Sequence, residues 1–385
     1  MLVLGVLAQA AGATFSNAPA FLLPALETEH GLDLSRAGLL VAAPTVGFLV
    51  SLMAWGAIVD RIGERRVLVL GMTLTAAAAA GAAVAAAASS FLATGLMLLV
   101  GGTAASSANA ASGRVVVGWF PPHRRGLAMG IRQMALPLGV AFGALTVPRI
   151  AENHGVGWAL AIPVAAAAVA AIACLFVVDP PRPDRAAAAQ SGLLDNPYRS
   201  SSVLWRIHGV SVLLVVPQYL VWTFALVWLM SDRHWSAASA GLLVTVTQLL
   251  GAAGRIAAGA LSDRVGSRMR PLRWVAIAAA LSMGALALTD ALGSSASVAL
   301  LVLASVITVA DNGLAFTAVA EIAGPYWSGR ALGAQNTSQY LAASLVPPLF
   351  GGLIAAVSFP VAFAVTALFP LVAVPLVPAD RPERH

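Results

Sequence analysis

The chain contains no lysine and a single cysteine, and only 10% of its 385 residues are charged. Because all 22 basic residues are arginine, it has no G-K-[ST] phosphate loop of the kind used to hydrolyse ATP. Cys174 alone can form neither a disulfide nor a thiolate metal site within one chain. The six histidines show no H-E-x-x-H spacing. We therefore expect no enzyme, no bound metal and no cofactor.

The chain is rich in apolar residues. Hydrophobic residues make up 59% of it, and the mean hydropathy is +0.86, far above that of soluble domains. These values predict an integral membrane protein in contact with the lipid bilayer. The net charge of +6 suggests nucleic acid at first sight. However, arginines that lie between apolar runs are signals of membrane topology, so we expect no nucleic-acid partner.

Twelve apolar runs are long enough to cross a bilayer, whose core of roughly 30 Å takes about 20 helical residues. The first begins without a basic segment and is longer than the apolar core of a signal peptide, so we expect it to be an uncleaved helix. The runs are 2–23, 37–59, 67–88, 91–117, 127–147, 158–178, 207–230, 238–261, 272–291, 296–322, 331–356 and 360–377.

Arginine is distributed very unevenly among the loops between these runs. The loops after every second run, together with the C-terminus, hold 16 arginines, whereas the opposite loops hold three, Arg36, Arg149 and Arg233. By the positive-inside rule, both termini are cytoplasmic. The longest polar segment divides the chain into an N-terminal six-helix bundle (1–178), a cytoplasmic linker (179–206) and a C-terminal six-helix bundle (207–385).

The two predicted bundles share an internal repeat. GAIVDRIGERR at 56–66 recurs 203 residues later as GALSDRVGSRM at 259–269, with six of eleven positions identical. The same offset relates AGLLV at 37–41 to AGLLV at 240–244, and it pairs Asn109 with Asn312, Gly126 with Gly329 and Gly130 with Gly333. The halves are therefore one six-helix unit duplicated in parallel orientation.

Both copies of this loop resemble the G-x-L-x-D-R-x-G-R-R signature of the major facilitator superfamily. The resemblance implies an all-α membrane protein of twelve transmembrane helices, with substrate bound near the midplane and access alternating by rocking of the halves. Glu64 departs from the signature, because the family favours a basic residue there, so the family's ion pair at that position does not carry over. The matching residues are Gly56, Asp60, Arg61, Gly63 and Arg65, then Gly259, Asp263, Arg264, Gly266 and Arg268.

The two loop aspartates have a predicted role in closing the cytoplasmic side. We expect Asp60 to lie near the start of the run at 331–356, and Asp263 near the start of the run at 127–147. A carboxylate at a helix N-terminus meets unpaired N–H groups and the positive end of the helix dipole. Each aspartate would thus hold the two halves together.

Charged residues inside the membrane cost at least about 2.5 kcal/mol each, so they are candidates for function. Arg132 and Arg255 lie deep in their runs, and other polar residues recur at a similar depth; the alternatives are an interhelical hydrogen bond for Arg132 and a structural ion pair for Arg255. Arg114 is near a cytoplasmic helix end, where we expect it to extend toward lipid headgroups. The predicted substrate-binding set is Asn109, Arg132, Gln133, Arg255, Asn312, Gln335 and Asn336.

Asp311 is the predicted proton-coupling residue. It falls near the middle of the run at 296–322, with no cation nearby on the same helix. A buried carboxylate either pairs with a cation or takes up a proton more readily than in water. A permanent pair with an arginine is the alternative. Glu321, close to the cytoplasmic end of the same run, is expected to be solvated.

The leading hypothesis is a secondary transporter in the cytoplasmic membrane that carries a small organic or inorganic anion together with protons. Arg255, four residues before Gly259, resembles the arginine of monocarboxylate transporters, and RGLAMGIRQMALPLG resembles a segment of the cyanate and nitroimidazole permeases. The alternatives are a proton-coupled drug exporter and a non-transporting receptor on the same fold. We expect a monomer.

Overall fold

The computed structural model describes residues 1–30 and 32–380, and over these residues it is helical and has no β-strand. Eleven helical segments within this range are long and apolar enough to cross a membrane. The first helix, α1, is 20 residues long and contains Gln9, Ser16 and Asn17, which lower its hydropathy, and it is not one of the eleven. The predicted all-α membrane architecture is confirmed. Arg381 and Arg384, counted in the predicted topology, lie outside the described residues.

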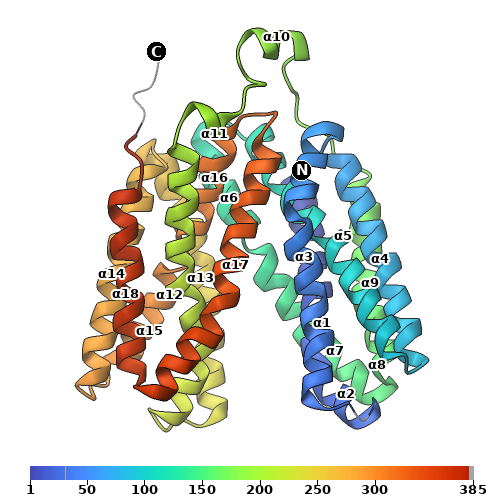
Figure 1. Ribbon diagram of the computed structural model, residues 1–385, viewed down its shortest axis with the longest axis vertical. Helices are drawn as coiled ribbons and strands as arrows, with labels where there is room; N and C mark the ends of the chain where they lie inside the picture. The colour runs from blue at the N-terminus through green and yellow to red at the C-terminus, as the bar shows by residue number, and fades with distance from the viewer. Residues whose placement is uncertain (31, 381–385) are drawn as a thin grey trace. The chain divides into compact units, whose positions relative to one another are not determined.

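The chain forms two compact units, and unit 1 comprises residues 1–119, 134–195 and 323–337. In it, α3 and α4 both pack on α5, and α1 packs on α5, α7 and α9 (Figure 1). Its complete helices are α1 (Leu2–Phe21), α2 (Leu23–His30), α3 (Leu34–Ile62), α4 (Glu64–Ala87), α5 (Phe91–Trp119), α7 (Ala135–His154), α8 (Val156–Ala159), α9 (Ala161–Cys174) and α10 (Arg185–Gln190).

Unit 2 comprises residues 120–133, 196–322 and 338–385. Here α14 packs on α15 and α18, and α13 packs on α6. Its helices are α6 (Pro122–Arg132), α11 (Pro197–Ser200), α12 (Val203–Ser231), α13 (Ala237–Val265), α14 (Met269–Ala291), α15 (Ala296–Ile307), α16 (Asp311–Ala323) and α18 (Phe359–Leu376). The remaining helix, α17 (Ser328–Ala356), gives its first residues to unit 1 and the rest to unit 2.

These compact units differ from the two sequence repeats by an exchange of helical segments. The fifth helix of the N-terminal repeat gives α6 to unit 2, and the eleventh helix of the chain gives its start to unit 1. The exchange reflects close packing of α6 on α13 and of the start of α17 on α3, described below. The division into six-helix bundles at residues 178 and 207 remains a prediction from the sequence.

The two signature loops terminate their helices at glycine. α3 begins after Asp33, whose side chain accepts a hydrogen bond from the N–H of Arg36, and it ends at Gly63 with a φ of 93°. α13 begins after Ser236, which caps the N–H of Ser239, and it ends at Gly266 with a φ of 65°. Positive φ values favour glycine, so these two signature glycines are explained by the chain reversal.

One predicted helix, at 127–147, is interrupted in the structure. α6 ends at Arg132, and α7 begins at Ala135. The cause is Pro137, which has no N–H to donate to the carbonyl of Gln133 four residues earlier. Arg132 therefore occupies the end of a helix, and the carbonyl of Gln133 lacks the partner that a continuous helix would provide.

The predicted run at 296–322 is found as one candidate membrane span, Ala296–Ala323, but its helix is also interrupted. α15 ends at Ile307, α16 begins at Asp311, and between them the N–H of Ala310 bonds three residues back to the carbonyl of Ile307 at 3.1 Å. The β-branched residues Ile307, Thr308 and Val309 weaken the helix at this point. Asp311 thus lies in the first turn of a helix and not in the middle of one.

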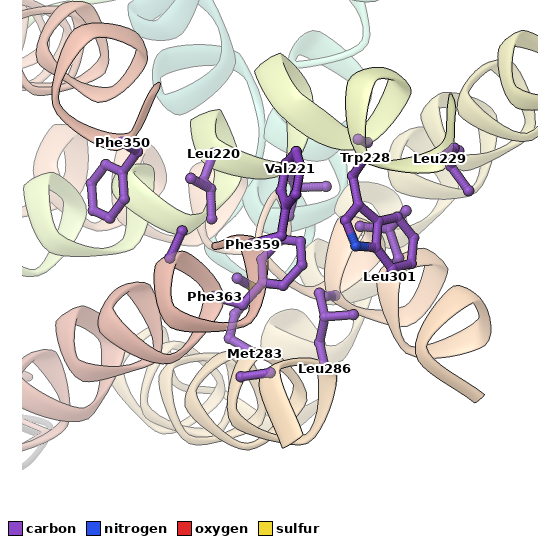
Figure 2. Packing of buried hydrophobic residues seen from close by; sticks show 14 of the residues in the cluster. Leu220, Val221, Trp228, Leu229, Met283, Leu286, Leu301, Phe350, Phe359 and Phe363 are labelled. Atoms are coloured by element: carbon purple, nitrogen blue, oxygen red, sulfur yellow. The ribbon is translucent and has the colours of Figure 1, made fainter. Parts of the chain in front are cut away.

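A hydrophobic cluster packs several helices of unit 2 against one another. Figure 2 shows Trp228, Phe363, Met283 and Leu301 packed together from α12, α18, α14 and α15. The rings of Trp228 and Phe363 meet edge to face, with their centroids 6.0 Å apart. Because all four side chains are at most 1% exposed, this part of the unit is a tightly packed support.

Candidate functional site

Asp60, in the last turn of α3, binds the start of α17. Its Oδ1 accepts a hydrogen bond from the N–H of Gly329 at 2.9 Å, and its Oδ2 accepts one from the N–H of Arg330 at 3.0 Å. A carboxylate in this position satisfies N–H groups that the helix leaves unpaired. We call Asp60, Gly329 and Arg330 the Asp60 junction.

Asp263, near the end of α13, binds the second turn of α6, which begins at Pro122. Its Oδ1 accepts from the N–H of Gly126 at 3.0 Å, and its Oδ2 accepts from the N–H of Leu127 at 2.8 Å. We call Asp263, Gly126 and Leu127 the Asp263 junction. All three residues correspond to the Asp60 junction at the repeat offset of 203. Each aspartate thus lies close to the residues predicted for it, Asp60 at the first turn of α17 and Asp263 at the beginning of the predicted run at 127–147.

Glycines allow each pair of helices to approach this closely. A Cβ added to Gly56 would lie 2.3 Å from the carbonyl oxygen of Gly329, and one added to Gly259 would lie 2.1 Å from that of Gly126. No side chain fits at such distances, so the signature glycines are required by helix packing. The two junctions thus share both hydrogen bonds and backbone contact.

Around Asp60 the charges are almost fully buried. Arg114 lies 3.3 Å from the Asp60 carboxylate (Nη1 to Oδ1) and 2.7 Å from Glu64 (Nε to Oε1), with side-chain exposures of 3%, 1% and 0% for the three residues. Arg182 reaches Glu64 from the linker at 3.2 Å. The expectation that Arg114 extends to the headgroups is therefore wrong, because two carboxylates hold it inside. The departure of Glu64 from the family signature supplies one of them.

Around Asp263 the charges are more accessible. Arg268 lies 2.6 Å from Asp263 and 3.2 Å from Glu321, and Glu321 is also 3.5 Å from Arg125. The side chains of Arg268 and Glu321 are 12% and 21% exposed. Glu321 was expected to be solvated, but the structure places it in ion pairs with Arg268 and Arg125. Burial lowers the pKa of Arg268, but hydrogen bonds and charges from Glu321 and Asp263 outweigh it, and the net shift is upward.

The other arginines of the signature, Arg61, Arg65 and Arg264, have exposed side chains. Only the main-chain N–H of Arg65 takes part in a contact between segments, donating to Asp179 of the linker at 2.6 Å. These arginines face outward from the junctions.

Arg132 and Arg255, the two deep arginines, meet at one residue of unit 2. The Nη1 of Arg132 donates to the side-chain oxygen of Gln133 at 2.9 Å, and the Nη1 of Arg255 donates to the main-chain carbonyl of Gln133 at 3.4 Å. Arg132 is 1% exposed and Arg255 is 5% exposed. The structure therefore brings three of the predicted site residues together at the interruption between α6 and α7.

Arg255 has few partners for a buried cation. Its Nε has no hydrogen-bond partner, and it forms no ion pair within 4 Å in the part of the chain that the structure describes. Its guanidinium lies 5.7 Å from the ring centroid of Trp222, and it lines a small hollow together with Trp222, Gln248 and Ser305. An ion in this state lacks compensation for its lost hydration.

Asp311 is the complementary buried anion in the same unit. It is 1% exposed, and neither of its carboxylate oxygens has a hydrogen-bond partner. Arg255 is the charged group that acts on it electrostatically. The two residues therefore influence each other without forming a salt bridge.

Next to Asp311, a chain of amides crosses the unit. The Nδ2 of Asn312 donates to Gln218 at 3.0 Å, and the Nε2 of Gln339 donates to the Oδ1 of Asn312 at 3.2 Å. These three side chains are at most 8% exposed and come from α16, α12 and α17. They tie the first turn of α16 to both neighbouring helices.

The remaining predicted site residues belong to unit 1. Asn109 lies in α5, and Gln335 and Asn336 lie in the first part of α17. All three are buried, and the Nδ2 of Asn336 donates to the carbonyl of Leu332 at 2.9 Å.

The chain as a whole is similar to known proteins of one family. A sequence model described as Major Facilitator Superfamily matches residues 4–347. The chain belongs to the major facilitator superfamily. It is 52% identical over 365 residues to a protein of Mycobacterium tuberculosis strain H37Rv named an uncharacterized MFS-type transporter, with 94% of this chain and 81% of that relative covered. A relative with a corresponding name from strain CDC 1551 is 51% identical over the same coverage.

Solved structures of the superfamily share the fold. The fucose:proton symporter FucP of Escherichia coli aligns with a TM-score of 0.78 at 16% identity, covering 98% of this chain and 97% of that one. The human organic anion transporter TETRAN aligns with a TM-score of 0.72 at 20% identity, covering 98% of both chains. The chain is thus a multi-pass membrane transporter of this superfamily.

Sequence reasoning missed several residues around the superfamily motifs. Glu64 was not predicted as a partner of Arg114, because it lies where the sequence departs from the signature. Nor was Arg182 of the linker predicted as a partner of Glu64. Gln218 and Gln339 were not predicted to bind Asn312. A signal for the last two was present, because each is an amide inside an apolar run.

Proposed function

We propose that this transporter moves a small anion across the cytoplasmic membrane by alternating access, coupled to protons, with both termini in the cytoplasm. The observation that carries the proposal is Arg255, a buried guanidinium with one long hydrogen bond and no ion pair in the described chain. Such a group is costly unless a ligand of opposite charge compensates it. A bound anion would do so.

The geometry of Arg255 favours a planar oxyanion. Its only hydrogen bond in the described chain uses Nη1, so the edge formed by Nε and Nη2 is available. Two parallel N–H groups on one edge of a guanidinium match the two oxygens of a carboxylate. Trp222, Gln248 and Ser305 line a small hollow together with Arg255.

Arg132 adds a second positive charge to the proposed site. Gln133 binds both arginines, and Phe316 lies 5.8 Å from the Arg132 guanidinium. Two cations against one carboxylate, Asp311, leave this part of unit 2 positive. Gln133 and Asn312, in the same unit, complete this part of the proposed substrate-binding set. The roles predicted for Asn109, Gln335 and Asn336, in unit 1, remain predictions from the sequence.

Asp311 is the proposed proton carrier. Its unbonded oxygens can accept a proton, and its only electrostatic partner among charged side chains is the arginine proposed to bind the anion. When an anion neutralises Arg255, the Asp311 carboxylate loses the charge that stabilises its ionised form. Protonation is then favoured, so anion and proton move together in symport.

The Asp60 and Asp263 junctions are the proposed cytoplasmic latches. Each joins a helix of one repeat to a helix of the other through hydrogen bonds from two consecutive main-chain N–H groups. Breaking both would let the repeats part on that side.

Transport by purified protein in proteoliposomes tests the proposal. Formate, acetate, lactate, benzoate, cyanate and nitrate would be offered with an inward proton gradient, with tetraphenylphosphonium as the lipophilic cation. We expect gradient-driven uptake of at least one anion. Transport of the cation with none of the anions would overturn the proposal in favour of drug export.

The Asp311→Asn variant distinguishes proton coupling from movement of the anion itself. We expect it to lose accumulation driven by the proton gradient and to keep exchange of labelled for unlabelled anion. If its uptake depends on the proton gradient as the wild type's does, Asp311 has no role in coupling.

A further inference from the structure

The carbonyl of Gln133 is an unusual hydrogen-bond acceptor. In a continuous helix it would bind the N–H four residues later, but that residue is Pro137, which has none. Arg255 donates to this carbonyl instead, at 3.4 Å. The sequence thus provides, at one point, an acceptor without a helical partner and a buried donor opposite it.

This bond lies at one end of a helix pair whose other end is the Asp263 junction. Along α13, Arg255 and Asp263 are eight residues apart, which is about 12 Å of helix. Between them α6 and α13 touch through their backbones, since a Cβ on Gly130 would lie 2.6 Å from the carbonyl oxygen of Arg255. Polar contacts therefore hold the pair at both ends and glycine packing holds it between them.

We propose that the bond between Arg255 and Gln133 is an anion-sensitive tie that couples substrate binding to the Asp263 junction. An anion on the free edge of the guanidinium draws it away from the Gln133 carbonyl, and a bond already 3.4 Å long breaks with a small displacement. α6 then remains attached to α13 at the cytoplasmic end alone. Gln133 acts here as a positioning residue, through its main chain. This inference rests on the proposed binding of an anion to Arg255.

The other repeat has the same packing without the tie. At the offset of 203, Arg255 corresponds to Leu52, and Pro137 corresponds to Tyr340. A Cβ on Gly333 would lie 2.8 Å from the carbonyl oxygen of Leu52, so the backbones are close there too. However, the side chain of Leu52 has no hydrogen-bond donor, and α17 runs without interruption from Ser328 to Ala356. The Asp60 junction should therefore not respond to the anion.

Two thiol reporters compare the junctions. Ser262 and Val59 occupy equivalent positions in the repeats, and both are 0% exposed. Each would be changed to cysteine in a Cys174→Ala background, in the full chain reconstituted into nanodiscs, and its rate of modification by N-ethylmaleimide would be measured. The rate reports how often the helices part.

Pro137→Ala tests the tie without altering Arg255, because alanine restores an N–H within the helix for the Gln133 carbonyl. We expect Pro137→Ala, and likewise Arg255→Gln, to raise the rate at Ser262→Cys about three- to tenfold, as for loss of one hydrogen bond of ordinary net strength. The rate at Val59→Cys should change by less than about twofold. Equal rates at Ser262→Cys in wild type and both variants would overturn the tie.

Anions are then added as the sodium salts of formate, benzoate and cyanate. Any of them that is transported should raise the Ser262→Cys rate in the otherwise wild-type chain and have no further effect with Pro137→Ala. If a transported anion leaves that rate unchanged, the tie is not anion-sensitive, although the proposed function survives. If none of the anions in the transport screen is carried, the proposed function fails, whatever Pro137→Ala does to the rate.

Should Ser262→Cys disturb folding, hydrogen exchange of the Gly126 and Leu127 amides gives the same comparison without a thiol. These two amides donate to Asp263, and the amides of Gly329 and Arg330 serve as the matched control. Faster exchange of the first pair alone in Pro137→Ala supports the tie, and equal exchange overturns it.

Discussion

The Asp60 and Asp263 junctions have the same backbone geometry and different charges. In each, one aspartate accepts hydrogen bonds from two consecutive main-chain N–H groups of a helix, and a pair of glycines brings the helices into contact. At Asp60, Arg114 and Glu64 are at most 3% exposed, and only the outer members Arg182 and Arg330 of this network reach 19% and 31%. At Asp263, by contrast, Arg268 and Glu321 are 12% and 21% exposed. The two repeats thus share the main-chain hydrogen bonds and the glycine contacts, whereas the charged side chains around them differ.

A second difference lies about two turns further along the helices of each junction. The helix that begins at the Asp263 junction is interrupted at Gln133, and Arg255 binds the interruption. The helix that begins at the Asp60 junction continues through Asn336, opposite Leu52. One junction is therefore built around a buried pair, Arg114 and Glu64, and the other is connected to the proposed substrate site.

The largest expected difference between the junctions is in stability. Arg114→Met leaves the buried Glu64 and Asp60 with too little positive charge, which costs about 3–5 kcal/mol. Arg268→Met removes ion pairs that water partly screens, and it should cost about 1 kcal/mol. The thermal midpoint in detergent, followed by tryptophan fluorescence, should fall much further for Arg114→Met. An equal fall would show that burial does not distinguish the two networks.

The shared backbone contact predicts a smaller effect, equal at both junctions. Gly56→Ala and Gly259→Ala each place a Cβ within 2.3 Å of a carbonyl oxygen. Separating the helices should cost about 1–3 kcal/mol in either case. The same melting assay measures both, with Gly284→Ala in α14 as control, because a Cβ there meets nothing within 4 Å. Loss of stability in only one of the two variants would contradict the common geometry.

The smallest expected effect is the response to salt. Raising the ionic strength from 0.1 to 1 M shortens the screening length from about 10 Å to about 3 Å. The exposed charges around Asp263 should weaken, so exchange of the Gly126 and Leu127 amides should accelerate about two- to fivefold. Exchange of the Gly329 and Arg330 amides should change less. The opposite ranking would mean that the Asp60 network is the wetter of the two.

The repeat made the fold and the junctions predictable from the sequence. Because Asp60 and Asp263 sit in matching loops, their helix partners followed from the family resemblance and from the affinity of carboxylates for helix starts. The interruption at Gln133 was less accessible, since prolines are common in membrane helices and Pro137 alone does not reveal one. The interruption before Asp311 involves neither proline nor glycine, so no strong local signal announced it.

The parts of the site that were not predicted depend on contacts between segments far apart in the sequence. Arg114 binds Asp60 of α3 and Glu64 of α4, and Glu64 also binds Arg182 of the linker. A pattern along one helix cannot show that such distant segments converge. For the same reason the depth of Arg114 suggested snorkelling, where the structure has a buried network. Arg132 and Arg255 were predicted to act jointly, and the structure brings both to Gln133; whether they hold a substrate remains a prediction.

Substitution of Arg255 tests the central claim, anion binding by its guanidinium, most directly. Uptake of an anion identified in the proteoliposome screen would be measured for wild type, Arg255→Lys and Arg255→Gln, with Arg36→Gln as a control because the Arg36 side chain is 68% exposed. Loss of a buried charged hydrogen-bonding partner costs about 2 kcal/mol or more, so uptake by Arg255→Gln should fall about 30-fold or further. Arg255→Lys, which keeps the charge but loses the two-pronged edge, should fall between Arg255→Gln and wild type. Uptake by Arg255→Gln within about twofold of the Arg36→Gln control would contradict the account.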